Sequence, residues 1–158
     1  MPEPSDVGAA LLARDEASRS NGIEIVDVGA GSAVVRMTVR ADMVNGHGVC
    51  HGGLIFMLAD SALAFASNSG NVNTLAASAS IDFVRPARLG TRLLATAIAV
   101  HQRGRTGHYD VVVIDEAAGD AGHEVIALFR GRTSETGGAV IEDTEPMKDT
   151  GSIEDSGS

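Results

Sequence analysis

Leu54-Ile55-Phe56-Met57-Leu58-Ala59-Asp60-Ser61-Ala62-Leu63-Ala64-Phe65-Ala66 is the most apolar helical stretch of the chain, and it carries one charged residue, Asp60. The stretch directly follows Cys50-His51-Gly52-Gly53. A helix that is apolar on every side packs inside a domain. A buried carboxylate without a partner costs free energy or takes a raised pKa. Stability alone does not favour an aspartate at this position, so we expect Asp60 to be catalytic.

The rest of the chain predicts an antiparallel sheet around this helix. Two β-rich stretches, residues 23–28 and 33–39, precede the helix and are joined by a glycine-bearing hairpin signal. Strands that follow one another through short turns favour antiparallel pairing, and the apolar helix packs on one face of the sheet. The fold class is therefore α+β. Four further strands are expected at 76–84, 92–101, 108–115 and 124–132, and an amphipathic helix at 7–19.

Length and charge divide the 158 residues into one domain and a tail. Residues 135–158 hold seven acids and one base, which leaves only −3 of the net charge of −9 on residues 1–134. The tail is polar and rich in Gly, Ser and Thr, so we predict that it is disordered. The acidic balance argues against a nucleic-acid partner.

Neither a membrane helix nor a signal peptide is expected. The longest apolar run has 13 residues, below the roughly 20 that span a bilayer. The N-terminus has no basic start followed by an apolar core, and the single cysteine excludes an intrachain disulfide. These features predict a cytoplasmic protein without a membrane partner.

The start of the apolar helix offers donors for a negatively charged oxygen. The first N–H groups of a helix are unpaired, and the helix dipole strengthens them. Glycine at Gly52 and Gly53 lets a substrate carbonyl approach closely, although a glycine turn for tight helix–sheet packing has the same sequence. Upstream, Asn45 either orients water or a carbonyl or simply forms a turn.

His47, Cys50 and His51 also suggest a metal site or a reactive thiol. Their spacing fits no standard zinc pattern, and a small buried cysteine is more common beside a helix start than a catalytic thiolate. The glycines lack the Lys-Ser/Thr of a phosphate-binding P-loop. We therefore expect no metal and no other cofactor.

Five arginines between Phe83 and Tyr109, with no acid among them, suggest a phosphate-bearing ligand. The planar guanidinium binds phosphate oxygens in pairs. Solvated strand ends remain an equally good interpretation of any one of them. The five are Arg85, Arg88, Arg92, Arg103 and Arg105.

The spacing of Gly52 and Asp60 constrains the site. Eight residues along an α-helix span about 12 Å, so one reacting carbon cannot contact both groups of one helix. If Gly52 binds the oxygen and Asp60 drives the attack, the two groups come from two chains. The site then lies at a two-fold dimer interface.

Several motifs occur together in an order that resembles one known family. These are Asn45-Gly46-His47-Gly48, His51-Gly52-Gly53, Leu58-Ala59-Asp60 and Ile81-Asp82-Phe83-Val84-Arg85-Pro86-Ala87. They resemble hotdog-fold acyl-CoA thioesterases of the phenylacetic-acid-degradation, or PaaI-type, group, over roughly residues 8 to 133. The resemblance implies an antiparallel sheet wrapped around a long central helix, dimers joined edge to edge with shared active sites, and homotetramers.

The resemblance also implies residue roles. Asp60 is the catalytic carboxylate, Asn45 positions the attacking water or the thioester, Gly52 gives its N–H to the thioester oxygen, and His51 supports this turn. Ser78 falls where family members often carry a hydroxyl near the acyl end. A related branch has a threonine one turn after the acid, where this chain has Ala64, so a hydroxyl partner for Asp60 is expected from Ser61 or Ser78.

The implied reaction is hydrolysis of an aryl-acetyl-CoA or other medium-sized acyl-CoA to a free acid and CoA, with Asp60 as general base or nucleophile. Gly53 contacts the substrate in this interpretation, and the nucleotide phosphates are held by Arg85, Arg88, Arg103 or Arg105 with Thr106. Two alternatives stay open. A hotdog enoyl-CoA hydratase releases no thiol from a saturated acyl-CoA, and a non-catalytic acyl-CoA binding module binds without turnover.

Overall fold

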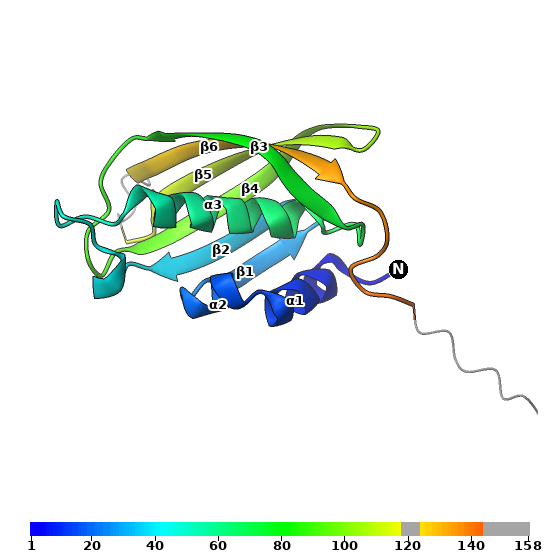
Figure 1. The fold of residues 1–158 in the computed structure, drawn as a ribbon, viewed down its shortest axis with the longest axis horizontal. Helices are drawn as coiled ribbons and strands as arrows, with labels where there is room; N and C mark the ends of the chain where they lie inside the picture. The colour runs from blue at the N-terminus through cyan, green and yellow to red at the C-terminus, as the bar shows by residue number, and fades with distance from the viewer. Residues whose placement is uncertain (118–123, 144–158) are drawn as a thin grey trace, which may run out of the picture.

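Six strands form one antiparallel sheet, and the long helix α3 lies across one of its faces (Figure 1). The computed structural model describes residues 1–117 and 124–143. The strand order is β1-β2-β4-β5-β6-β3, so β1 and β3 are the two edges. The predicted α+β class and the sheet around a central helix are confirmed. The elements are α1 Pro4–Arg14, α2 Glu16–Ser20, β1 Glu24–Gly29, β2 Ser32–Thr38, a 3-10 turn Ala41–Met43, α3 Gly52–Ser67, β3 Thr74–Phe83, β4 Arg92–Arg103, β5 Thr106–Asp115 and β6 Glu124–Glu135.

The alternation of side chains decides which face of the sheet receives α3. Successive residues of a strand point to opposite faces, and every second residue in the middle of β4 and β5 is buried. On β6, Gly131 makes room for the helix, because a Cβ there would lie 2.6 Å from Leu63 Cδ2. The core under α3 contains Leu58, Leu63, Phe65, Leu93, Val111 and Val113, none more than 1 % exposed.

One stripe of α3 stays partly open although the helix is apolar on nearly every side. Met57, Asp60, Ala64 and Ser67 are all half-buried and follow the spacing of one helix face. The adjacent edge strand β3 exposes most of its length and has a hydrogen-bonded neighbour, β6, on one side alone. Large apolar side chains are exposed along it and just beyond it, namely Leu75, Phe83 and Val84.

The predicted helix at 7–19 is two helices with a break at Asp15. Asp15 ends α1 with φ −95° and ψ 83°, and its side chain then caps α2 by accepting a hydrogen bond from the N–H of Ser18. A capping aspartate competes with continuous helix because its carboxylate satisfies a free N–H of the next helix. α1 packs beside β1, and α2 contacts α1 and α3 (Figure 1).

The segment after residue 134 begins as ordered structure. Glu135 is the last residue of β6, and residues 136–141 pack back onto the loop between α3 and β3. The N–H of Asn73 donates to the carbonyl of Gly138, and the carbonyl of Asn73 accepts from the N–H of Thr136. Val140 is 5 % exposed. The domain therefore extends past the predicted boundary at 134. Residues 144–158, the remainder of the predicted tail, lie outside the described residues.

Candidate active site

The start of α3 is built so that one backbone donor stays free. His51 caps the helix, and its Nδ1 accepts a hydrogen bond from the N–H of Gly53 at 2.9 Å. The carbonyl of His51 accepts from Leu54 and Ile55. The N–H of Gly52 has no acceptor within residues 1–117 and 124–143. Gly52, rather than Gly53, is therefore the donor that a substrate oxygen can use.

An aromatic ring lies close against Gly52 and favours a residue without a side chain there. A Cβ on Gly52 would lie 3.0 Å from Cζ of Phe83, at the end of β3. A hollow of about 320 Å³ opens beside this contact and includes Arg85 in its wall. The N-terminal end of α3 thus meets the C-terminal end of the edge strand.

Asn45 forms a turn and still keeps donors available. Its Oδ1 accepts from the N–H groups of His47 at 2.9 Å and Val49 at 3.3 Å, and its own N–H donates to the carbonyl of Val49 at 2.8 Å. A bridge between Val44 and Cys50 closes the loop in front of the helix. The side-chain amide hydrogens of Asn45 have no acceptor in the described part of the chain, so the turn is formed and the expected role in orienting water or a carbonyl stays a prediction.

Asp60 lies in the middle of α3, eight residues after Gly52. Its carboxylate is half-buried and makes no hydrogen bond within the described residues. Burial raises the pKa of Asp60, and the negative charge of Asp15 raises it further. A raised pKa makes the ionised carboxylate a better base. It faces a hollow of about 120 Å³ whose other walls are Leu63, Ala64, Thr74, Leu75 and Ala76.

Neither expected hydroxyl partner reaches Asp60 within one chain. Ser61 is buried and its hydroxyl lies 2.9 Å from that of Ser18. Ser78 pairs with Arg132, which lies between the inward-facing Gly131 and Thr133, so both side chains lie on the outer face of the sheet. Arg132 Nε donates to Ser78 Oγ there at 3.3 Å. The expectation for Ser78 is therefore not met in this chain, because the edge-strand residues that face Asp60 are Thr74, Leu75 and Ala76.

The register of β3 explains the shift from Ser78 to Ala76. Residue 77 is skipped in the pairing of β3 with β6, which marks a bulge between Ala76 and Ser78. A bulge adds one residue and changes which side chains point inward. Nothing in the sequence marked this position.

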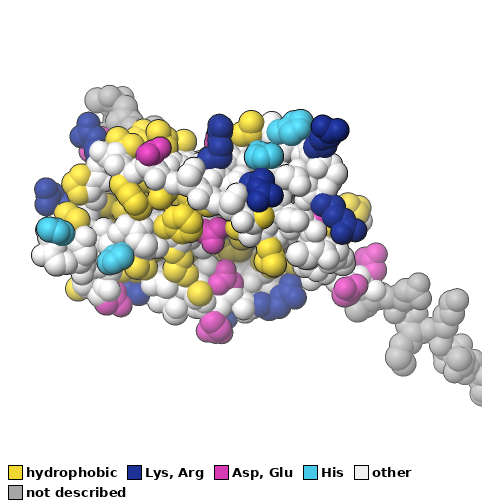
Figure 2. All heavy atoms as spheres, turned by 45° about the horizontal axis from the view of Figure 1, so that its top comes forward, with side chains coloured by type: hydrophobic (Ala, Val, Ile, Leu, Met, Phe, Trp, Pro, Cys, Tyr) yellow, Lys and Arg dark blue, Asp and Glu magenta, His cyan; other side chains and the backbone are white. Residues whose placement is uncertain are grey.

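The five arginines do not form one cluster. Arg85, Arg88 and Arg92 lie at the start of β4, whereas Arg103 and Arg105 lie at its end in the turn before Thr106. Twelve residues of strand separate them, or about 36 Å. Figure 2 likewise shows arginine at both ends of the visible face. The phosphate site predicted from a single run of sequence is therefore two separate groups in one chain.

The two groups also differ in their ion pairs. Arg85 lies 3.4 Å from Glu124, and Arg92 lies 3.4 Å from Glu116. In the part of the chain that the structure describes, Arg88, Arg103 and Arg105 make no such pair. These three are the cations with a free guanidinium.

Cys50 is not a reactive thiolate. Only 4 % of it is exposed, and burial raises the pKa of its thiol. Its Sγ contacts the carbonyl of His51 at 3.7 Å. Among residues 1–117 and 124–143, no three His, Cys, Asp or Glu side chains are grouped to hold a metal ion. No helix in this part of the chain is long and apolar enough to cross a membrane.

Sequence reasoning missed the neighbours of Asp60 on α2. Asp15 and Ser18 were included in one surface helix, yet Ser18 is buried at 2 % exposure and contacts Ser61. An Asp three residues before a Ser is a common capping pattern, and it was the available signal of a helix start at this point.

Comparisons with known proteins agree with this geometry. The family model described as Thioesterase superfamily matches residues 47–121. The chain is 41% identical over 131 residues to the acyl-coenzyme A thioesterase PaaI of Escherichia coli K12, covering 83% of this chain and 90% of that protein. The structure of the E. coli PaaI protein from the phenylacetic acid degradation operon superimposes with a TM-score of 0.81 at 40% identity, over 86% of this chain and 95% of that chain.

A Streptococcus mutans UA159 protein solved with bound acetyl CoA is also similar. It gives a TM-score of 0.67 at 26% identity, over 73% of this chain and 89% of that chain. The match to the E. coli enzyme spans the helix start, Asp60 and the edge strand in one continuous similarity. The chain belongs to the thioesterase superfamily, as a hotdog-fold thioester hydrolase of the PaaI type.

Proposed function

We propose that two copies of this chain hydrolyse an acyl-CoA thioester at sites that each copy shares with the other. One observation carries the proposal. Along the edge strand β3, Gly52 lies beside Phe83 and Asp60 lies beside Leu75 and Ala76. Each chain thus holds two half-sites, one at each end of its exposed edge.

Antiparallel pairing of β3 with β3 of a second copy joins the halves. In such a pair the positions of opposite residues add to a constant, so a two-fold axis beside Ala79 sets Leu75 of one copy against Phe83 of the other. The free N–H of Gly52 then approaches the partner's Asp60. The exposed apolar residues of the edge and the open stripe of α3 support this pairing, because they need cover.

The joined site supplies the groups that thioester hydrolysis needs. The Gly52 N–H, strengthened by the helix dipole, binds the thioester oxygen as negative charge develops on it. The carboxylate of Asp60 either takes a proton from an attacking water or attacks the carbonyl carbon itself. In both routes the carbon–sulfur bond breaks, the CoA thiolate leaves and takes up a proton, and water supplies the oxygen of the free acid. Asn45 uses its free amide hydrogens to orient the carbonyl or the water.

The acyl group fits a hollow that continues from Asp60. A space of about 470 Å³ between α1 and the end of α3 shares Ala64, Thr74 and Leu75 with the hollow at Asp60. Leu11 and Phe65 give it an apolar wall. An aryl-acetyl or medium-length acyl group matches this size and lining, in keeping with the named activity of the E. coli relative.

The same pairing brings the two arginine groups together. The turn after β3 of one copy, with Arg85 and Arg88, lies beside the start of β3 of the other, where its Arg103 and Arg105 are found. Together with Thr106 they form a phosphate site for the CoA nucleotide. Two such dimers form a tetramer through the outer faces of their sheets, where Ile98, Val112 and Leu128 are exposed. Cytoplasmic location stays a prediction from the sequence.

Mixed dimers test the shared site. Asp60→Asn and Asn45→Asp each remove one half; the second keeps the Oδ1 that holds the loop but loses the amide hydrogens. Each variant alone should be nearly inactive in a thiol-release assay with phenylacetyl-CoA and octanoyl-CoA. Refolded together, they should recover about a quarter of wild-type activity, because half of the dimers are mixed and half of their sites are complete. Mixed dimers seen by mass spectrometry that stay inactive refute the shared site.

A further inference from the structure

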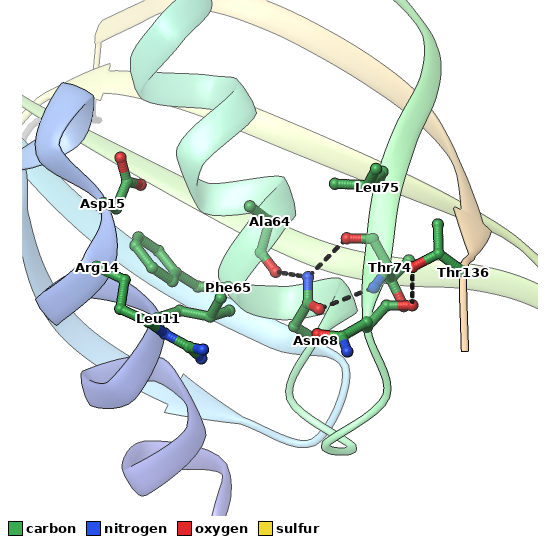
Figure 3. A pocket seen from close by; sticks show the side chains of 10 residues that line it. Leu11, Arg14, Asp15, Ala64, Phe65, Asn68, Thr74, Leu75 and Thr136 are labelled. Atoms are coloured by element: carbon green, nitrogen blue, oxygen red, sulfur yellow. Dashed lines mark hydrogen bonds between the residues drawn. The ribbon is translucent and has the colours of Figure 1, made fainter. Parts of the chain in front are cut away.

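A second carboxylate lines the larger hollow that lies next to the one at Asp60. Asp15, at the break between α1 and α2, lines the larger hollow together with Arg14 and Phe65 (Figure 3). This hollow shares Ala64 and Thr74 with the smaller one at Asp60. Two acids on different elements therefore line two hollows that have wall residues in common, and the reaction described above uses one of these acids.

Asp15 is fixed in place by a chain of hydrogen bonds that ends next to Asp60. Its Oδ1 accepts from the N–H of Ser18 at 2.9 Å, and its Oδ2 accepts from the hydroxyl of Ser18 at 2.6 Å. The hydroxyl of Ser18 lies 2.9 Å from that of Ser61, in a buried position. Because Ser18 gives its one proton to the carboxylate, Ser61 must be the donor between the two hydroxyls. The chain thus runs from Ser61 to Ser18 to Asp15.

This chain ties α2 to α3 at the residue that follows Asp60. Ser61 and Ser18 are 7 % and 2 % exposed, so water does not compete for their bond. A buried hydroxyl pair is retained where both groups are satisfied, and it holds the two helices in one register. The distance between the two carboxylates is set by the fold rather than by flexible side chains.

The charged groups around Asp60 are few in the described residues. No other titratable side chain lies on α3 itself, and β3 offers Thr74, Leu75 and Ala76. Under the helix the sheet presents Tyr109, whose phenol pKa is raised by burial and by the charge of Glu135. Arg14 lines the larger hollow, and its guanidinium donates to the carbonyls of Val140 at 3.0 Å and Ala10 at 3.3 Å.

We propose that Asp15 is a positioning residue for the reaction: the hydrogen bonds through Ser18 and Ser61 hold its negative charge close to the catalytic end of the site, where it acts on the carboxylate of Asp60. Like charges in a partly dry space disfavour each other's ionised form. A carboxylate that ionises less readily is a stronger base once ionised. Asp15 therefore makes Asp60 more reactive, and this statement rests on the proposed role of Asp60.

The Asp15→Asn variant removes the charge and keeps the fold. Asparagine caps helices about as well as aspartate, its oxygen can accept from the N–H of Ser18, and its amide can donate to the Ser18 hydroxyl. The measurement is a pH titration of the Asp60 carboxyl carbon by NMR in protein labelled at aspartate, with Asp60→Asn to assign the signal. We expect the midpoint of Asp60 to fall in Asp15→Asn.

Kinetics provide the second measurement. The acid limb of kcat/KM for phenylacetyl-CoA should move to lower pH in Asp15→Asn by the same amount as the NMR midpoint. Above that limb, kcat should fall by less than about tenfold, because a less basic carboxylate is a weaker catalyst. KM should stay within twofold of wild type if the acyl pocket is unchanged, about the resolution of such assays.

Two control variants separate charge from structure. Glu16→Gln removes the same charge one residue away on exposed α2, where Glu16 lies 3.1 Å from Arg19, and it should move neither the midpoint nor the limb. Asp15→Glu restores the charge and should return both toward wild type. Asp15→Ser, also a good cap, replaces Asp15→Asn if the latter does not fold.

Each result of these experiments either supports or overturns the coupling of Asp15 to Asp60. If the Asp60 midpoint is the same in wild type and Asp15→Asn, the inference is wrong. An equal fall in Glu16→Gln also overturns it, because the effect is then general charge. If the midpoint falls as expected but the wild-type protein releases no thiol from acyl-CoA, the proposed function fails while the coupling of Asp15 to Asp60 stands.

Discussion

The start of α3 and the position of Asp60, eight residues further along the helix, treat their polar groups in opposite ways. At the N-terminal end nearly every group is satisfied, with His51 capping Gly53 and Asn45 folding its own loop, and a few donors are left free. At Asp60 the carboxylate has no hydrogen bond in the described residues, and burial and Asp15 raise its pKa. The first end is prearranged to bind negative charge at no further cost. The second holds an acid in a state that favours reaction over stability.

Asp60→Asn should have the largest effect, and it tests the half-buried carboxylate. We expect kcat to fall by at least ~10²-fold, the scale of a lost acid–base group, with the fold and the oligomer unchanged. The raised pKa means that the folded chain binds this proton more tightly than the unfolded chain. The destabilisation is therefore absent below the ordinary value of 3.8 and grows as the pH rises through the folded value.

The thermal stability of this variant should depend on pH in the direction that the raised pKa of Asp60 requires. At pH 7 the Tm of Asp60→Asn should exceed that of wild type, and the difference should shrink as the pH is lowered toward 4. Calorimetry at several pH values measures it. Near wild-type turnover in pure Asp60→Asn, or a Tm that falls at pH 7, would reverse the comparison between the two ends.

Truncation should have the next largest effect, since the C-terminal segment packs at the Asp60 end. A chain ending at Thr136 loses Val140, whose burial is worth about 2 kcal/mol, and the hydrogen bonds to Asn71 and Asn73. We expect its Tm to fall by about 4–8 °C. A chain ending at Asp143 is the matched control and should melt like wild type. Equal melting of both truncations would show that residues 137–143 contribute nothing.

Phosphate contacts compare the ends directly. Arg88→Ala lies toward the Gly52 end and Arg105→Ala toward the Asp60 end, and each should raise KM for acyl-CoA several-fold with kcat little changed. High salt should weaken both effects. Arg19→Ala, which loses the same charge on α2, is the control. With a short thioester that lacks the nucleotide, the variants and the wild type should have the same KM. If KM rises equally with this substrate, the arginine has a structural role instead.

Ser78→Ala should have the smallest effect, because Ser78 lies midway along β3 on the outer face. Its contact with Arg132 is exposed and worth little. Thiol release should stay within about twofold of wild type, below the scale of any acid–base contribution. A hundredfold loss would mean that Ser78 reaches Asp60 of a second copy. Residues 74–76 would then not be the part of β3 that matters at the acid.

Much of the fold follows from local pattern. The apolar run predicted α3, and alternation with short turns predicted the six strands, although β4 and β6 are longer than expected. The free N–H of Gly52 was also expected from the rules of helix starts, whereas the resemblance alone pointed to His51. These features depend on neighbours in sequence, so one sequence suffices to find them.

What the sequence did not predict depends on contacts between distant residues. The bulge beside Ala76 arises from pairing with β6, and it moved Ser78 to the outer face. The partner of Ser61 is 43 residues away on a helix that looked like ordinary surface. Arg88 and Arg105 are far apart because the whole of β4 lies between them. A count of charges along the chain does not reveal this distance.

The exposed edge strand has a consequence for how this protein can change over generations. Ten residues of β3 present unpaired backbone groups on one side, together with Leu75 and Phe83. An open edge of this kind invites aggregation, so in the proposed dimer a second copy that covers it protects the protein as well as completing a site. Selection against aggregation and selection for turnover then act on the same ten positions. A lineage that lost the need for the reaction would still be held to this strand by the need to remain in solution.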